Sequence, residues 1–259
     1  MNQVIKQVIK VGNSAGVLVP KEWMNGKAKV ELIVKPINIK KDILEILEPY
    51  LEDVIGIYLV GSYARGEQTE RSDVDVLVIT NKISRRVKRG KYDVLLITRK
   101  QIDNTLENNA LPIIPMLKEA KGMLNDEYLK SIKNQQLSKK NIRWNMDMIK
   151  SALNIDKKLI ELKKDYSEYV GDSVSYSLIL NIRSLYIIEC LRKNQKWGTE
   201  GFKSFIKRIS GSLEAYEGYL RVKNDEKTKK ALPIEGAEKL LDYAYKMLIK
   251  QEKWIKRKD

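Results

Sequence analysis

The stretch "IYLVGSYARGEQTERSDVDVLVI", residues 57–79, decides the fold of this chain. Two apolar runs, each typical of a buried strand, stand on either side of a Gly61-Ser62 pair and a polar segment. The second run begins with two acids, Asp73 and Asp75, separated by one residue. Because side chains alternate between the faces of a strand, both carboxylates project from the same face. Carboxylates this close repel each other unless a proton or a cation compensates.

The segments around this stretch predict an alternation of helices and strands. Apolar spacing predicts a helix over 40–53 with a kink at Pro49, and a short helix runs from Ser62 to about Arg65. Further helices are expected near 99–109 and 113–124, and strands over 54–60, 74–80 and 92–98. The basic segment "NKISRRVKRGK", residues 81–91, is expected to be the turn between the last two strands. From Asp126 onward we expect only helices, at roughly 126–163, 172–194, 199–222 and 234–257.

A third acid, Asp93, stands at the start of the apolar run 92–98. If strands 74–80 and 92–98 are neighbours, Asp93 arrives beside Asp73 and Asp75. Three carboxylates at one end of a sheet form an oxygen-only site suited to one or two Mg²⁺ ions. Gly61 lets a ligand approach the backbone closely, and Ser62 begins a short helix whose free N–H groups can hold a phosphate. This pattern predicts nucleotidyl transfer, with Asp93 as the general base toward an attacking hydroxyl.

The composition excludes several classes of protein. The 259 residues include no histidine, which removes imidazole metal sites and histidine-dependent nucleophile or ribonuclease chemistry. The single cysteine, Cys190, excludes an internal disulfide, suits a reducing cytoplasm and is interpreted as a core residue. No apolar run approaches the roughly 18 uninterrupted residues of a membrane span, and no signal peptide is visible. We therefore expect a cytoplasmic protein with no membrane partner.

The net charge of +15 is unevenly distributed. Residues 1–36 carry a net +4 and residues 136–259 a net +10, whereas residues 37–135 carry only +1. Basic ends favour an anionic partner at either end of the chain. The alternative for the C-terminal part is an ordinary solvated surface rich in lysine and glutamate.

The stretch "GSYARGEQTERSDVDVLV" closely resembles the signature of the DNA polymerase beta-like nucleotidyltransferase superfamily, and most of all its minimal, antitoxin-type prokaryotic enzymes. The resemblance implies an α+β core, a mixed sheet with flanking helices, over residues 37–125. It implies that an NTP, ATP above all, is the substrate and that Mg²⁺ is the cofactor. The residues that it assigns are, for the nucleotide phosphates, Gly61, Ser62 and Arg65, and, as catalytic metal ligands, Asp73, Asp75 and Asp93.

The first 36 residues predict a separate β-rich unit. Strands are expected over 3–11, 17–20 and 28–36, with a short helix or turn between the last two. The stretch "KVGNSAGVLVPKEW", residues 10–23, resembles the AbrB/MazE-like swapped-hairpin DNA-binding family. That resemblance implies a homodimer with Lys6, Lys10 and Asn13 on or near the face presented to DNA. The alternative is a hairpin that serves only dimerisation or packing, and Leu18 replaces a residue that is often basic in such proteins.

Residues 126–259 predict an all-helical bundle, because apolar residues recur there at helical spacing. Three residues on one expected helix, Tyr216, Tyr219 and Arg221, either face a cleft or pack against the bundle core.

The leading hypothesis is an enzyme that transfers a nucleoside monophosphate from an NTP to a hydroxyl group. The acceptor stays open between a protein, an RNA and a small molecule. A DNA-binding N-terminal dimer would suit antitoxin-like autoregulation. The alternative of another class is a DNA-binding transcriptional regulator whose middle domain senses nucleotide without catalysis.

Overall fold

The computed structural model describes residues 3–33, 37–70, 72–135 and 137–256. The chain divides into two compact units, Met1–Asn38 and Ile39–Asp259.

The first unit is built around a short hairpin. Strands β1 (Ile9–Val11) and β2 (Ser14–Gly16) pair antiparallel through a two-residue loop, and a 3₁₀ helix, η1 (Lys21–Trp23), follows. The expected strands at 17–20 and 28–33 are wrong, while 34–36 lie outside the described residues. Their apolar side chains are exposed, and the described part of the unit offers no third strand for them to pair with. Apolar alternation without a pairing partner does not make a strand.

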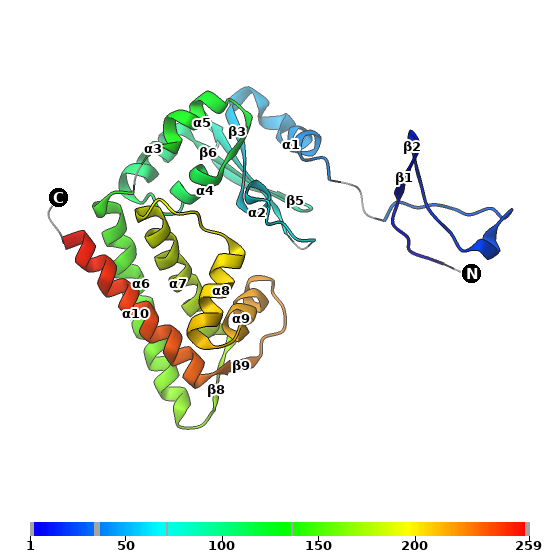
Figure 1. The fold of residues 1–259 in the computed structure, drawn as a ribbon. Coiled ribbons are helices and arrows are strands. Elements are labelled where there is room, and N and C mark those ends of the chain that lie inside the picture. The colour runs from blue at the N-terminus through cyan, green and yellow to red at the C-terminus, as the bar shows by residue number, and fades with distance from the viewer. Residues whose placement is uncertain (1–2, 34–36, 71, 136, 257–259) are drawn as a thin grey trace. The chain divides into compact units, whose positions relative to one another are not determined.

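The second unit begins with a helix and a five-stranded mixed sheet (Figure 1). Helix α1 (Ile39–Leu47) is followed directly by a 3₁₀ helix, η2 (Glu48–Asp53), which contains Pro49. The change of helix type occurs where the sequence predicts a kink. The sheet has the order β5-β6-β4-β3-β7, in which β4 and β6 are parallel and all other neighbours are antiparallel. Its strands are β3 (Val54–Val60), β4 (Val74–Thr80), β5 (Arg85–Arg89), β6 (Tyr92–Thr98) and β7 (Lys121–Leu124). The mixed sheet with flanking helices confirms the α+β prediction.

Both edge strands differ from the sequence-based expectation. Strand β5 lies inside the basic segment that was expected to be only a turn, and β7 occupies the end of the helix expected over 113–124. Helix α4 (Ile114–Glu119) therefore ends earlier than expected. Neither edge strand has a clear apolar alternation in its sequence. Charged residues, such as those of β5, are common on edge strands because they prevent pairing with other chains. Pairing with β6 and β3 makes them strands, and this pairing is invisible to local periodicity.

Helices cover the sheet on both faces. Alternate residues of β4, Val74, Val76 and Val78, pack with Ile43 and Leu47 of α1. On the opposite face, Leu77 and Ile79 pack with helices α3 (Arg99–Asn108), α4 and α5 (Asp126–Lys133). Both core clusters are therefore built on β4, which explains its nearly complete burial.

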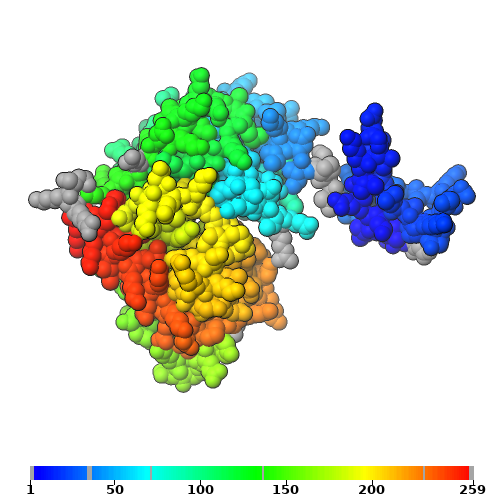
Figure 2. Space-filling model, in the orientation of Figure 1, coloured from blue at the N-terminus to red at the C-terminus, as the bar shows by residue number. Residues whose placement is uncertain are grey.

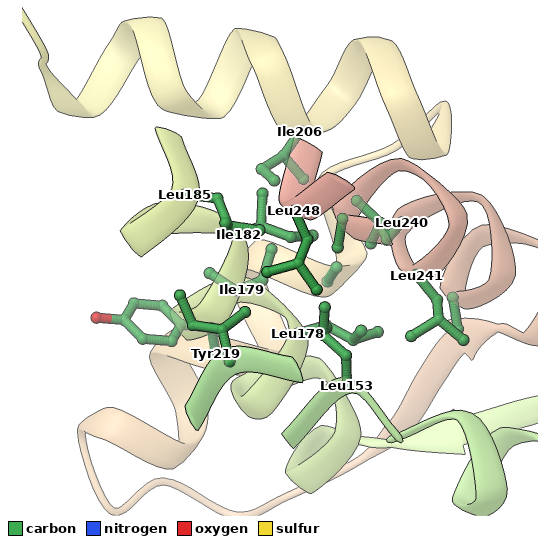
Figure 3. Packing of buried hydrophobic residues seen from close by; sticks show 14 of the residues in the cluster. Leu153, Leu178, Ile179, Ile182, Leu185, Ile206, Tyr219, Leu240, Leu241 and Leu248 are labelled. Atoms are coloured by element: carbon green, nitrogen blue, oxygen red, sulfur yellow. The ribbon is translucent and has the colours of Figure 1, made fainter. Parts of the chain in front are cut away.

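The remaining helices form a bundle with its own core. They are α6 (Lys139–Lys164), α7 (Asp172–Arg192), α8 (Thr199–Ser210), α9 (Glu214–Lys223) and α10 (Ile234–Lys256). Figure 3 shows Leu153 of α6, Leu178 and Ile182 of α7, and Leu248 of α10 converging in this core. The helical character of this region is confirmed, with interruptions. The expected helix 126–163 divides into α5 and α6, and 199–222 divides at Gly211, whose φ is +83°.

Two short strands also occur where only helices were expected. Strands β8 (Tyr169–Gly171) and β9 (Lys230–Pro233) pair antiparallel at one end of the bundle. Residue 257, at the end of the last expected helix, lies outside the described residues. Cys190 is buried in the bundle, as expected. Among the described residues, α7 alone is long and apolar enough to cross a membrane, and here it packs in the bundle core.

Candidate active site

The acids of the opening stretch meet at one end of the sheet. Strands β4 and β6 run parallel with Asp75 opposite Asp93, and Val60 at the end of β3 is opposite Asp75. The turn at Gly61 therefore leaves β3 beside the first residues of both acid-bearing strands. Asp73 lies immediately before β4 and is exposed. Asp75 and Asp93 lie side by side because the parallel strands β4 and β6 begin together, and the antiparallel strand β3 ends next to the start of β4.

Gly61 is required at this turn on two grounds. Its φ is +69°, a left-handed conformation that side chains with a β-carbon rarely adopt. A β-carbon built there would lie 2.2 Å from Oδ2 of Asp75, far inside van der Waals contact. The short helix α2 (Gly61–Arg65) begins at this residue, so Ser62 lies in its first turn beside the carboxylate. The structure thus brings Gly61, Ser62 and Asp75 together.

Asp75 carries an unfavourable charge in this position. Burial, followed by repulsion from the carboxylates of Asp93 and Asp73, raises its pKa from 3.8 to about 6, although Lys223 opposes the shift. A group perturbed in this way by burial and like charges is characteristic of functional sites. Oxygen ligands with excess negative charge also fit a hard divalent cation.

Asp93 has a partner that the sequence does not predict. Nε and Nη2 of Arg86, on the neighbouring strand β5, donate to the two carboxylate oxygens at 2.6 Å each. This bidentate pair, together with Lys88, lowers the pKa of Asp93 and weakens it as a base. Among the described residues no three acidic, histidine or cysteine side chains are close enough to hold a metal ion. Arg86 thus neutralises the third acid where the sequence suggests a cation.

Arg65 lies next to the turn, but its guanidinium group is already paired. Nη1 donates to Glu119 at 2.5 Å and Nε donates to Glu67 at 2.9 Å. The other oxygen of Glu119 accepts the backbone N–H of Gly61 at 2.7 Å. In this geometry Arg65 positions two carboxylates around the turn and does not present a free cation to a phosphate, contrary to its predicted role. Glu119 was missed because it comes from α4, 58 residues away from Gly61.

The same network connects the sheet to the bundle. Glu67 accepts the backbone N–H of Thr199, the first residue of α8, at 3.0 Å. A β-carbon at Gly198 would lie 2.2 Å from a Glu67 oxygen, so a larger residue there would displace this carboxylate. Figure 2 shows the segment containing α8 in direct contact with the segment containing α2. A cavity of about 20 Å³ between them, lined in part by Arg65, Arg183 and Trp197, is large enough only for a water molecule.

Three residues of α9, Tyr216, Tyr219 and Arg221, pack in the bundle. Tyr216 and Tyr219 are buried in the bundle core, and the Tyr219 ring stacks on Tyr176 with centroids 5.5 Å apart. Arg221 donates two hydrogen bonds of 2.8 Å to Asp172. Of the two alternatives that the sequence leaves open for these residues, the structure supports packing.

The predicted DNA-facing residues lie in the first unit. Lys10 is in β1 and Asn13 is in the loop of the hairpin, whereas Lys6 precedes β1. All three are exposed.

Comparison with known proteins supports the family that these residues suggest. Residues 39–143 match the model of the nucleotidyltransferase domain. A protein of Methanocaldococcus jannaschii named "Putative protein adenylyltransferase" is 40% identical over a 70-residue alignment, and the match covers 23% of this chain and 68% of that protein. The crystal structure of a nucleotidyltransferase-like protein from Exiguobacterium sibiricum is 15% identical with a TM-score of 0.37, over 82% of this chain and 75% of that one. On the family match and the extent of the M. jannaschii relative, this chain belongs to the nucleotidyltransferase domain family.

Proposed function

We propose that the chain transfers a nucleoside monophosphate from an NTP to an acceptor hydroxyl, with Mg²⁺ and at the sheet end described above. The observation that carries this proposal is the register of Asp75 opposite Asp93, beside the turn at Gly61. Because Asp75 and Asp93 are opposite each other on neighbouring strands, two of the acids that an enzyme of this class needs lie side by side. The exposed Asp73 supplies a third beside them.

Asp73 and Asp75 are the residues that would hold the cation. Their ligand atoms are all carboxylate oxygens, and burial, with the neighbouring carboxylates of Asp93 and Asp73, raises the pKa of Asp75, which a bound cation would oppose. Asp93 becomes a third ligand once its ion pair with Arg86 opens. A bound divalent cation offsets the charge of the triphosphate and of the three carboxylates.

The reaction assigned to the chain is a displacement at phosphorus. An acceptor oxygen bonds to the α-phosphorus of the NTP, the bond to the bridging oxygen breaks, and pyrophosphate leaves. The hydroxyl proton passes to Asp93, which requires that its ion pair with Arg86 open first. Gly61 permits the close approach of the triphosphate and Ser62 contacts it, while Arg65 holds Glu119 and Glu67 in place.

The nucleotide and acceptor that we favour are ATP and a protein hydroxyl. The support is the name of the M. jannaschii relative, a protein adenylyltransferase. Label on RNA or on a small molecule, in the assay described next, would instead identify one of the other two acceptor classes.

The experiment is incubation of the full chain with Mg²⁺ and each α-labelled NTP in turn, with protein, tRNA and aminoglycoside acceptors. We expect label from ATP on protein and release of pyrophosphate. The Asp75→Asn variant should lose at least about 100-fold in rate. Asp103→Asn, which removes an exposed acid of α3, serves as the control and should retain activity. No turnover by either the wild type or the Asp75 variant would instead support the non-catalytic regulator.

We further propose that the N-terminal unit pairs with its copy in a second chain and contacts DNA through Lys6, Lys10 and Asn13. The support is that none of the described residues 3–33 is buried, although many are large and apolar. Exposed examples are Ile5, Leu18, Met24, Val30 and Ile33. A unit of this size cannot stabilise itself without a partner surface.

DNA binding by the full chain tests the second proposal. Fluorescence anisotropy with a labelled duplex should show binding that weakens steeply as salt is raised, because lysine–phosphate contacts release counterions. At a fixed salt concentration, Lys10→Glu should lower the DNA affinity of the chain, whereas Lys27→Glu, outside the hairpin, should lower it less. Unchanged DNA affinity in the Lys10→Glu variant would instead support a unit that serves only dimerisation or packing.

A further inference from the structure

Helix α6 exposes an apolar stripe that the bundle does not use. Five large side chains along it are between 42% and 60% exposed: Trp144, Met148, Ile155, Leu159 and Leu162. At about 100° per residue these positions fall within roughly 60° of the helix circumference. They extend over about 27 Å of its length. With the exposed Ser151 between Met148 and Ile155, they form one face of the helix, which we call the α6 stripe.

The α6 stripe is separate from the face by which α6 packs in the bundle. The buried apolar residues of the helix, among them Met146, Leu153 and Ile160, lie on the opposite side. A surface helix of a single bundle needs only one apolar face. A second apolar face on the same helix is the pattern of a helix that packs on two sides.

The charges beside the α6 stripe identify what packs there. Four exposed residues follow one flank in the order Lys140, Asp147, Lys158 and Asp165, with alternating sign. In a second copy of α6 that runs antiparallel to the first, the same flank carries these four residues in the opposite order. Each lysine then faces an aspartate of the other copy: Lys140 faces Asp165, and Asp147 faces Lys158. The midpoint of both pairs is between residues 152 and 153, and the midpoint of the α6 stripe is residue 153. In a parallel twofold pair this flank would lie opposite the other flank of the partner helix, so these four charges would not meet one another.

We propose that α6 is a self-association surface, on which α6 of a second copy packs antiparallel about a twofold axis near residue 153. Such an interface is isologous, so both chains contribute the same stripe and the same flanking charges. At about half exposure, the five side chains offer on the order of 500 Å² per chain, or about 1,000 Å² per pair, which reaches the lower bound of specific interfaces.

The test is zero-length carbodiimide cross-linking of the full chain, followed by mass spectrometry of the linked peptides. We expect a link between Asp147 and Lys158. Within one straight helix these residues are separated by about 16 Å, too far for such a link, so it must join two chains. An equal mixture of ¹⁴N- and ¹⁵N-labelled chains should give mixed-isotope links. Because both linked residues are in α6, this link detects the α6 interface separately from any pairing of the N-terminal units.

A charge exchange makes the assignment specific. Asp147→Lys and Lys158→Asp, each alone, should weaken association at α6 at least about tenfold in sedimentation equilibrium, and the combined variant should restore it. Leu159→Gln should also weaken it, while Leu44→Gln, an exposed leucine of α1, should not. These residues are exposed, so the circular dichroism of each variant should stay unchanged. Absence of the 147–158 link, or no recovery in the combined variant, would overturn the proposal and leave the stripe to a different partner.

Discussion

The α-carbon of Gly61 lies so close to Asp75 that a β-carbon at position 61 would be 2.2 Å from the carboxylate oxygen Oδ2. This contact joins the end of β3 to the start of β4 at the point where Asp93 lies opposite Asp75. The turn and the acid are therefore one structural feature. A change in either residue must displace the other.

Gly61→Ala should disable the site more than it destabilises the fold. The left-handed φ costs an alanine about 1–2 kcal/mol, and the contact with Asp75 additionally displaces the carboxylate. A displacement of this kind should lower nucleotide transfer by at least about 100-fold. Gly66→Ala is the matched control, since Gly66 has a φ of +75° and open space around it. Similar rates for the two variants, measured with labelled NTP, would contradict this expectation.

Arg65 and Glu119 should behave as a coupled pair. Both side chains are largely buried, with 16% and 10% exposure, so removing one partner leaves an uncompensated charge. Arg65→Met and Glu119→Leu should each lower the free energy of unfolding by about 3 kcal/mol. The double variant should lose less than the sum, with a coupling energy of about 1–3 kcal/mol in chemical denaturation. Strictly additive losses would show that the pair contributes no interaction of its own.

Arg86 should compete with a divalent cation for Asp93. Arg86→Ala removes both hydrogen bonds to the carboxylate and should tighten Mg²⁺ binding about tenfold, or about 1.4 kcal/mol, in isothermal titration calorimetry. The control is Arg85→Ala, the adjacent residue, whose guanidinium group lies over the Tyr50 ring. Unchanged Mg²⁺ affinity in the Arg86 variant would exclude Asp93 from the ligand set.

The buried Asp156 should make stability fall as pH rises. Burial raises its pKa from 3.8 to about 6, although the Ser177 hydroxyl donates to it at 2.8 Å. Between these pH values the folded state binds more protons than the unfolded state, so stability decreases toward pH 6 and then levels off. Asp156→Asn should therefore stabilise the fold at pH 7, by about 3 kcal/mol at most, and have little effect near pH 3. Asp242→Asn, an exposed acid of α10, should show no such pH dependence in denaturation midpoints.

Periodicity located the central elements because each of them buries a face of its own. Strands β3, β4 and β6 have their expected bounds, and the helix expected over 40–53 is α1 followed by the 3₁₀ helix η2. The first unit shows the limit of this reasoning. Residues 17–20 and 28–33 alternate in the manner of strands, but the described part of the unit gives them no partner, and they are not strands.

By itself, the sequence determined that a turn at Gly61 and Ser62 follows one strand and that Asp73, Asp75 and Asp93 stand at the starts of two others, because strand alternation and turns are local properties. The pairing of β4 with β6, which puts Asp93 opposite Asp75, is a tertiary contact that the sequence left conditional. Only the tertiary structure decided what surrounds them. Arg86 reaches Asp93 through the pairing of β5 with β6, and Glu119 reaches Gly61 from 58 residues away. The charge state of each acid then follows from burial and neighbouring charges, which are properties of assembled side chains and not of any segment alone.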